Sequence, residues 1–330
     1  MNTVRVGILG TGGMGKNHVN SLKQMDGVEV SVVCDLNREI AEKFCEELEL
    51  TGCAVYTDFD EMLENETLDA LYVCIPPFAH DGQVVKAAEK GIHLFLEKPI
   101  ALNSTVAESM VEAIEKAGVV SQVGYQMRFR QSIQKLAAMI ADGTAGRPTL
   151  FQGRFWCRMD GAGPAWWPNK DKSGGQILEQ IVHIYDLALY LFGEPESATG
   201  LLRNLIHDND PAYTIEDTSV GMISFKNGAC ASITGSNCTA PVHFIGDYQI
   251  VFENVTLEYK STGQHWVTPD QASLLHVDGT SETFVEDANV YELEDADFIN
   301  AIREGRSACA PARDGLNDVA VIEQIINSTK

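Results

Sequence analysis

Short apolar runs alternate with amphipathic segments over the first 123 residues. The runs that predict strands are 3–9, 28–34, 54–56, 70–75, 92–96 and 119–123, and the segments that predict helices are 16–25, 41–50, 83–90 and 105–116. Strands that alternate with helices are typical of a parallel, doubly wound sheet. Ligands of such sheets bind beyond the carboxyl ends of the strands, so the loops that follow the strands are expected to form a site.

From residue 124 onward, apolar and polar residues alternate with a period of two. The expected strands are 151–159, 197–207, 218–225, 229–236, 243–252 and 256–259, and further helices are expected at 133–141, 293–303 and 315–327. Asn227-Gly228 is a hairpin signal. The pattern predicts a nucleotide-binding domain at 1–123, and at 124–330 a substrate-binding and oligomerisation domain built on a large, mainly antiparallel sheet. The open face of that sheet is a candidate interface between copies of the chain, because an uncovered broad sheet has to be covered.

Residues 173–192 read as one helix that is apolar nearly all the way round. Its ionisable residues Glu179, His183 and Asp186 are spaced i, i+4 and i+7, which puts them on one stripe. Burying such groups is costly unless they are paired or their pKa values shift, so the stripe indicates a site with chemistry. Two alternatives remain open: a core histidine bonded to an acid, and a metal site using Glu179, His183 and a further ligand.

The composition is that of a globular protein of 330 residues with a net charge of -23. That charge argues against nucleic acid as a partner. The eight cysteines form no C-x-x-C pair, which favours a reducing cytoplasm. We expect neither secretion nor membrane insertion, because the chain has no leader pattern and no apolar run of membrane-spanning length.

A glycine-rich turn, 10–15 (GTGGMG), lies between the first strand and the first helix. Gly10 suits a tight turn, Gly12 lets backbone amides approach a pyrophosphate, and Gly15 lets helix and strand pack closely. The second strand ends in Asp35, twenty residues after Gly15, where an acid bonds the ribose hydroxyls of NAD and repels the 2′-phosphate of NADP. The turn and the acid together predict an NAD site, although Arg38 nearby leaves NADP open.

Two loops after later strands are further candidates. The turn 76–80 (PPFAH) is expected to line the nicotinamide ribose, and His80 either touches the cofactor or caps the next helix. In the triplet Glu97-Lys98-Pro99, the proline biases Lys98 towards an extended backbone, and the lysine can hydrogen-bond a substrate hydroxyl. A surface Glu-Lys pair is the alternative for this triplet.

The segment 162–175 (AGPAWWPNKDKSGG) precedes the helix that carries His183. Trp166 and Trp167 are candidates to line a sugar or ring substrate, and Lys172 is a candidate to hydrogen-bond it. The alternative is that the two tryptophans hold a loop in place, and the sequence leaves both interpretations open.

Together, the glycine turn, Glu97-Lys98-Pro99, the segment 124–129 (GYQMRF), Gly174-Gly175, His183 and Asp186 resemble the glucose-fructose oxidoreductase and inositol dehydrogenase (Gfo/Idh/MocA) family over nearly the whole chain. The resemblance implies an NAD(P) cofactor, a sugar or cyclic polyol substrate, and dimers or tetramers built on the open sheet. It implies catalytic roles for Lys98, Glu179 and His183. Glu179 stands where the family commonly has Asp, which leaves open whether it contacts substrate or only orients His183.

The site residues that follow from motifs and resemblance form two sets. The cofactor set is Gly10, Thr11, Gly12, Gly13, Met14, Gly15, Asp35, Ile75, Pro76, Pro77, His80, Glu97, Lys98 and Gln126. The substrate set is Lys98, Tyr125, Arg128, Trp166, Trp167, Lys172, Glu179 and His183. No metal is assigned to either set.

The function that these observations predict is hydride transfer between a secondary alcohol of a sugar or cyclic polyol and NAD. His183 is expected to take the hydroxyl proton, Lys98 to polarise the oxygen, and Glu179 or Asp186 to orient the imidazole. The alternatives are a redox-neutral enzyme that recycles bound NAD and a non-catalytic NAD-binding regulator. The identity of the substrate and the reacting hydroxyl do not follow from the sequence.

Overall fold

A computed structural model describes residues 3–159, 163–239, 244–262 and 269–329. The chain divides into two compact units, the first formed by 1–126 and 289–316 and the second by 127–288 and 317–330. Residues Ala162 and His243, which begin two of the predicted segments, lie outside the described residues. The first unit thus takes in residues 289–316, a return of the chain that the boundary expected at residue 123 does not include.

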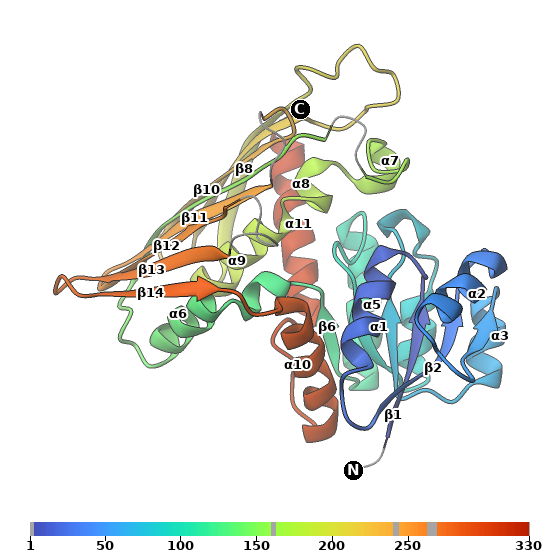
Figure 1. The fold of residues 1–330 in the computed structure, drawn as a ribbon. Helices are drawn as coiled ribbons and strands as arrows, with labels where there is room; N and C mark the ends of the chain where they lie inside the picture. Colours follow the sequence, from blue (N-terminus) through green and yellow to red (C-terminus); the bar gives the residue numbers. More distant parts are fainter. Residues whose placement is uncertain (1–2, 160–162, 240–243, 263–268, 330) are drawn as a thin grey trace. The chain divides into compact units, whose positions relative to one another are not determined.

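The first unit contains a six-stranded parallel sheet of order β3-β2-β1-β4-β5-β6 (Figure 1). Its strands are β1 Val4–Leu9, β2 Val28–Cys34, β3 Ala54–Tyr56, β4 Ala70–Val73, β5 His93–Leu96 and β6 Ser121–Val123. Its helices are α1 Gly13–Leu22, α2 Arg38–Glu47, α3 Phe59–Asn65, α4 Gln83–Glu89, α5 Ser104–Ala117 and α10 Val290–Glu304. The doubly wound parallel sheet is confirmed, and α3 is a helix that the pattern did not predict.

Helix α10 completes the core of the first unit. It lies against α1, and its Phe298 and Ile299 are buried in the apolar cluster that also contains Val19 of α1. The Phe298 ring meets Tyr72 and Phe95 edge to face, with ring centroids 5.6 and 5.7 Å apart. Residues from the end of the chain therefore pack with a sheet built from its beginning.

The second unit contains an eight-stranded sheet of order β14-β13-β12-β11-β7-β10-β9-β8. Its strands are β7 Pro148–Trp156, β8 Pro195–Arg203, β9 Thr218–Phe225, β10 Cys230–Ser236, β11 Ile245–Phe252, β12 Val255–Lys260, β13 Asp270–His276 and β14 Ser281–Glu286. Strands β7 and β10 are parallel, and the other pairs are antiparallel. The mainly antiparallel sheet is confirmed, and β13 and β14 extend it beyond the predicted strands.

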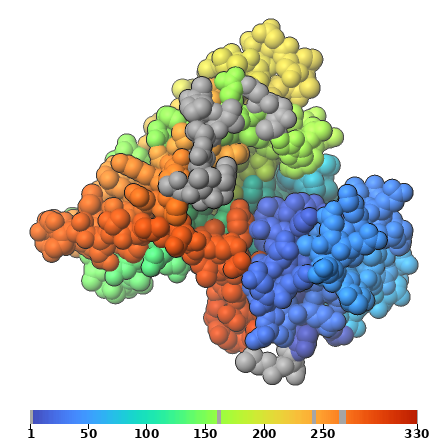
Figure 2. Space-filling view, in the orientation of Figure 1, coloured from blue at the N-terminus to red at the C-terminus, as the bar shows by residue number. Residues whose placement is uncertain are grey.

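Helices cover one face of this sheet. Helix α9 (Val182–Phe192) packs on β7 and β10, and α6 (Gln131–Ala141) lies against β13 and β14 (Figure 1). Helix α11 (Ala312–Ser328) starts in the first unit and continues into the second, where Ile325 packs against Gly200 and Gly221. In Figure 2 the loop between β8 and β9, drawn in yellow, stands out from the surface; its Leu205 and Ile206 are exposed.

The opposite face of the sheet is polar along its middle strands. Gln152 on β7 lies beside Ser232 on β10 and Gln249 on β11 in the strand register. Two residues further along β7, Arg154 forms an ion pair with Asp247 at 2.5 Å. These side chains line a shallow hollow with a volume of about 420 Å³.

The single helix predicted for 173–192 is wrong. The segment forms α7 (Lys170–Ser173), α8 (Gln176–Glu179) and α9, with breaks at 174–175 and 180–181. Gly174 and Gly175 have φ of +78° and +108°, a region that ends a helix. Glu179 therefore ends α8, while His183 and Asp186 belong to α9.

Candidate active site

The glycine turn has the backbone geometry that a bound pyrophosphate requires. Gly10 has φ of +94°, and a Cβ there would lie 2.5 Å from the carbonyl oxygen of Cys74. A Cβ on Gly15 would lie 2.4 Å from the carbonyl oxygen of Gly10. Gly12 and Gly13 instead face open space at the start of α1. The turn thus leaves room for phosphates at a helix N-terminus, where backbone N–H groups point outward.

Asp35, at the end of β2, has its carboxylate fixed by neighbouring donors. Its Oδ2 accepts hydrogen bonds from the backbone nitrogen and Oγ1 of Thr11 at 2.9 and 2.8 Å. Its Oδ1 accepts one from the backbone nitrogen of Asn37 at 3.0 Å. From the described residues, Oδ1 accepts only this one hydrogen bond and keeps a second lone pair, so the group can still accept a ribose hydroxyl. Arg38 is exposed, and its guanidinium lies 3.5 Å from Oε1 of Glu42.

The loop after β4 begins with Ile75 and Pro76 and turns through the short helix η1 (Pro77–Ala79). His80 follows this turn, and burial lowers the pKa of its imidazole to about 4. The next helix, α4, is preceded by Gly82 and receives no side-chain cap. The expectation that His80 caps this helix is therefore wrong, and its role at the cofactor remains a prediction.

The triplet that follows β5 is held by its own acid. Glu97 is 8% exposed, and its Oε2 accepts a hydrogen bond from the backbone nitrogen of Lys98 at 3.1 Å. The Lys98–Pro99 peptide bond is cis, and Lys98 is half-buried. The second carboxylate oxygen, Oε1, lies 2.9 Å from Nε2 of His18. The triplet is therefore anchored in the interior and is not a pair of surface charges.

Sequence reasoning missed His18. The residue lies in α1, three positions after Gly15, and is fully buried. Its partners Glu97 and Asp295 are 79 and 277 positions away in the chain, so no local spacing reveals them. A histidine three residues after the glycine turn is the signal that could have been noticed. Gln126, by contrast, lies where the first unit ends and donates a hydrogen bond to the Tyr291 hydroxyl at 3.2 Å.

In the second unit, a buried acid fixes the start of α8. The Oε1 of Glu216 accepts a hydrogen bond from the backbone nitrogen of Ile177 at 2.8 Å, and its Oε2 lies 3.0 Å from Nζ of Lys170. A Cβ on Gly175 would lie 2.7 Å from the same carboxylate. Glycine is thus needed where the chain turns past Glu216, which is the physical reason for the break before α8.

Glu179, at the end of α8, is bound by a tryptophan. The indole Nε1 of Trp167 donates a hydrogen bond to its Oε2 at 2.5 Å. Trp167 is 4% exposed and packs with Tyr213, whereas Trp166 is half-buried and Lys172 is exposed. Of the two tryptophans, Trp167 is thus placed to hold Glu179.

His183 lies in the first turn of α9 and is 7% exposed. On the same helix, Asp186 forms a buried ion pair with Arg128, whose Nε lies 3.1 and 3.0 Å from its two carboxylate oxygens. The Arg128 guanidinium also stacks over Tyr190, 4.3 Å from the ring centroid. Asp186 therefore binds an arginine, and its expected role in orienting His183 stays a prediction. Arg128 and Tyr125 are each 1% exposed, and their expected contact with a substrate stays a prediction.

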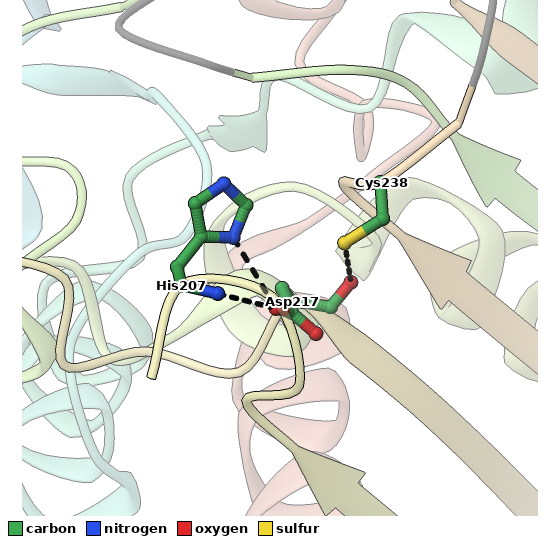
Figure 3. Close-up of side chains that lie close together, drawn as sticks. All are labelled: His207, Asp217 and Cys238. Carbon is green, nitrogen blue, oxygen red and sulfur yellow. Dashed lines mark hydrogen bonds and ion pairs between the residues drawn. The ribbon is translucent and has the colours of Figure 1, made fainter. Parts of the chain in front are cut away.

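Three side chains of types that bind metals meet elsewhere in the second unit: His207, Asp217 and Cys238, with their ligand atoms all within 4.8 Å of one another (Figure 3). Oδ2 of Asp217 accepts hydrogen bonds from the backbone nitrogens of Leu205, Ile206 and His207 and lies 3.2 Å from Nδ1 of His207. Sγ of Cys238 points instead to the backbone carbonyl of Asp217 at 4.0 Å. These N–H donors already use the carboxylate, so we interpret Asp217 as the residue that fixes the loop after β8.

Within the part of the chain that the structure describes, no helix is long and apolar enough to cross a membrane. All eight cysteines are among the described residues, and none of them forms a disulfide.

Comparisons with known proteins agree with these two units. The description "Oxidoreductase family, NAD-binding Rossmann fold" matches residues 4–125, and "GFO/IDH/MocA C-terminal domain" matches residues 133–258. Among curated relatives, the scyllo-inositol 2-dehydrogenase (NAD(+)) of Bacillus subtilis is 29% identical over 311 residues, 92% of this chain and 87% of the relative. The myo-inositol 2-dehydrogenase of Thermotoga maritima is 29% identical over 236 residues, 71% of this chain and 68% of the relative.

Solved structures show the same fold. Levoglucosan dehydrogenase in complex with NADH and levoglucosan superposes with a TM-score of 0.89 at 20% identity, covering 99% of this chain and 97% of that one. The glycine turn and the fixed carboxylate of Asp35 fit the cofactor that the family description names. The chain therefore belongs to the Gfo/Idh/MocA family and is an NAD-dependent oxidoreductase.

Proposed function

We propose that the protein is a dehydrogenase that transfers a hydride between a secondary alcohol of a sugar or cyclic polyol and NAD. Two of its relatives are named inositol dehydrogenases, and one of them spans 92% of this chain. The observation that carries the proposal is the presence of two sets of residues in one chain. The NAD-binding unit has the anchored triplet Glu97-Lys98-Pro99. The second unit has Glu179 at the end of α8 and His183 at the start of α9.

In this proposal Lys98 and His183 serve the reacting hydroxyl. Lys98 donates a hydrogen bond to the substrate oxygen and stabilises the negative charge that develops as its proton leaves. His183 takes that proton, because an imidazole has an unperturbed pKa near neutrality. NAD, when bound, accepts the hydride from the carbinol carbon. Oxidation of the alcohol to a ketone is thus balanced by one hydride to the cofactor and one proton to His183.

The same proposal gives Glu179 a role behind His183. Its carboxylate is held by Trp167, which fixes its position. A fixed carboxylate near the first turn of α9 suits either a contact with a second substrate hydroxyl or the orientation of the imidazole. Trp167→Phe tests whether the position of Glu179 matters for turnover.

A direct test is a panel of cyclitols, aldoses and their derivatives, each assayed with NAD and with NADP by the absorbance of the reduced nicotinamide. We expect turnover with at least one polyol or sugar and a preference for NAD, because the Asp35 carboxylate repels a 2′-phosphate. A panel with no reduced nicotinamide for any substrate contradicts the proposal.

A second candidate is a redox-neutral reaction with retained NAD. Two relatives, from Mediterraneibacter gnavus and Escherichia coli, are named 2,7-anhydro-N-acetylneuraminate hydratase and are 28% and 29% identical to this chain. A hydratase adds or removes water without net oxidation. Nucleotide released on denaturation, together with substrate conversion without net NADH, would favour this candidate over the dehydrogenase.

We also propose that the open face of the eight-stranded sheet joins copies of the chain into a homodimer or homotetramer. Met222 on β9 and Leu201 on β8 are 51% and 56% exposed on this face, beside the hollow lined by Gln152 and Arg154. Met222→Asp should lower the molar mass measured by light scattering, because a buried unpaired charge is costly. Ile40→Asp, on exposed α2 of the first unit, is the matched control. A monomeric wild-type protein contradicts this proposal.

A further inference from the structure

A histidine is buried between two carboxylates in the first unit. Nδ1 of His18 lies 2.8 Å from Oδ1 of Asp295, and its Nε2 lies 2.9 Å from Oε1 of Glu97. His18 and Asp295 are fully buried, and Glu97 is 8% exposed. A neutral imidazole donates only one hydrogen bond, whereas an imidazolium donates two. The two carboxylate acceptors therefore select the charged form.

The surroundings of His18 agree with a buried cation. Although burial lowers it, the carboxylates of Asp295 and Glu97 raise the pKa of His18 to about 10. The rings of Phe95 and Tyr72 lie with centroids 4.6 and 5.2 Å from the imidazole, and aromatic rings attract cations.

Burial favours the neutral form of three further titratable groups near this cluster. They are Tyr72 and Cys74, which lie in and after β4, and Glu294 of α10, which is fully buried. Burial raises the pKa of each well above its usual value. Burial thus disfavours a third negative charge beside the carboxylates of Asp295 and Glu97.

The two contacts of His18, with Asp295 and with Glu97, are called the clamp. Through Glu97 the clamp is connected to Lys98. While Oε1 of Glu97 is held by His18, its Oε2 accepts the backbone N–H of Lys98 at 3.1 Å. Gly124 packs on the same carboxylate, so close that a Cβ there would lie 3.0 Å from Oε1. Both oxygens of the Glu97 carboxylate are therefore held, and the side chain is restricted to one rotamer.

We propose that His18 is a positioning residue for Lys98: its imidazolium, clamped by Asp295, holds Glu97 so that the backbone of Lys98 stays in one place. The inference rests on the proposed function of Lys98 at the reacting hydroxyl. It deepens that function by extending the site inward to α1 and α10, which carry no residue of the predicted catalytic set. Pre-organisation of this kind lowers the cost of aligning the lysine in the transition state.

The clamp itself is tested without substrate. In the full-length protein labelled with ¹⁵N-histidine, both ring nitrogens of His18 should stay protonated from neutral to mildly alkaline pH. His80 is an internal control, because its pKa of about 4 keeps it neutral over the same range. A neutral His18 ring at neutral pH overturns the proposal, whatever reaction the enzyme performs.

The link to Lys98 is tested by His18→Gln. We expect the Lys98 amide to exchange its hydrogen about fivefold to tenfold faster, the equivalent of one ordinary hydrogen bond. The amide of Asp69, which donates to the carbonyl oxygen of Arg5 at 2.9 Å, should be unchanged. An unchanged Lys98 amide in a folded variant overturns the link between His18 and Lys98.

Kinetics then distinguish positioning from a merely structural role. His18→Gln should lower kcat about 10-fold or more, the order found for supporting partners of a reacting group, with little change in the dissociation constant of NAD. His276→Gln, the same substitution on β13, is the control. A folded His18→Gln enzyme with wild-type kcat overturns the proposal.

A second variant covers the case in which His18→Gln does not fold. Asp295→Asn keeps the imidazole and leaves Glu97 as its single carboxylate partner, so the loss of activity with rising pH should begin at a lower pH than in the wild type. An unshifted pH profile in a folded Asp295→Asn enzyme contradicts the clamp. If Lys98→Ala retains activity while the NMR and exchange results hold, the role of Lys98 is wrong and the clamp stands.

Discussion

The indole nitrogen of Trp167 and Oε2 of Glu179 are 2.5 Å apart, so the loop before α7 holds the last residue of α8. Trp167 also meets Tyr213 edge to face, with ring centroids 6.3 Å apart. The position of Glu179 thus depends on a side chain twelve residues earlier. The helix that carries His183 begins only after a break in the chain.

Trp167→Phe removes the indole donor and retains an aromatic ring beside Tyr213. We expect kcat/KM to fall about 10-fold, since hydrogen bonds to charged groups are worth about 1.5–3 kcal/mol, part of which water replaces. Thermal stability should change little. A variant with wild-type kcat/KM would show that the position of Glu179 does not matter for turnover.

His183→Asn removes the proposed base and keeps a polar side chain of similar size. Turnover of the substrate found in the panel should fall about 10²- to 10⁴-fold, the usual contribution of a general base. NAD binding, measured by fluorescence or calorimetry, should be nearly unchanged because His183 belongs to the second unit. Wild-type turnover in this variant would refute the assignment.

Asp35→Ala tests the choice of cofactor. The ratio of kcat/KM for NAD to that for NADP should fall by about 10-fold or more, since the variant loses hydrogen bonds to the ribose and the repulsion of a 2′-phosphate. Asn37→Ala, which leaves the carboxylate in place but removes the cap of α2, is the control. An unchanged ratio would place the adenosine ribose elsewhere.

Asp186→Asn tests the buried pair on α9. Because the Arg128 guanidinium is left without its counter-charge, we expect a loss of about 3–5 kcal/mol in the free energy of unfolding. Replacing both partners with Leu and Met should recover most of this loss. Denaturant unfolding followed by circular dichroism measures both variants, and a neutral effect of Asp186→Asn would argue against an ion pair.

The pH dependence of stability should show His18 and His80 of the first unit with opposite signs. The folded-state pKa of His18, about 10, exceeds the ordinary 6.5. Its contribution is therefore complete below about pH 6.5 and is lost as the pH rises through about 10, by at most about 1.4 kcal/mol per pH unit. His80, with a folded-state pKa of about 4, contributes above pH 6.5 and loses its contribution as the pH falls through about 4. Urea midpoints across this range test both slopes, and His18→Gln should flatten the alkaline one.

Much of the first unit follows from local patterns. The strands around the glycine turn are mostly apolar because both faces of a parallel sheet are covered, and Asp35 lies at a fixed spacing from the turn. Gly174 and Gly175 also indicate the break before α8. The apolar run that continues to Phe192 instead favours one continuous helix. The cause of the break, Glu216 against Gly175, lies 41 positions later in the chain.

The features that could not be predicted from the sequence are contacts between residues far apart in the chain. Arg128 and Asp186 are 58 positions apart, and their pairing depends on how η2 (Gln126–Phe129) packs on α9. Strands β13 and β14 contain few β-branched residues, so their alternation gave only a weak signal.

The return of residues 289–316 to the first unit has a consequence for synthesis of the chain. The nucleotide-binding sheet emerges first from the ribosome, yet Phe298 and Asp295 are translated only after all strands of the second unit. Until then, His18 lacks one of its two carboxylate partners, and the core around Val19 lacks the side chains of α10 that pack on it. The first unit to be translated is therefore completed only after all strands of the second unit have been made, and a nascent chain stopped before α10 should bind a holdase chaperone in preference to NAD.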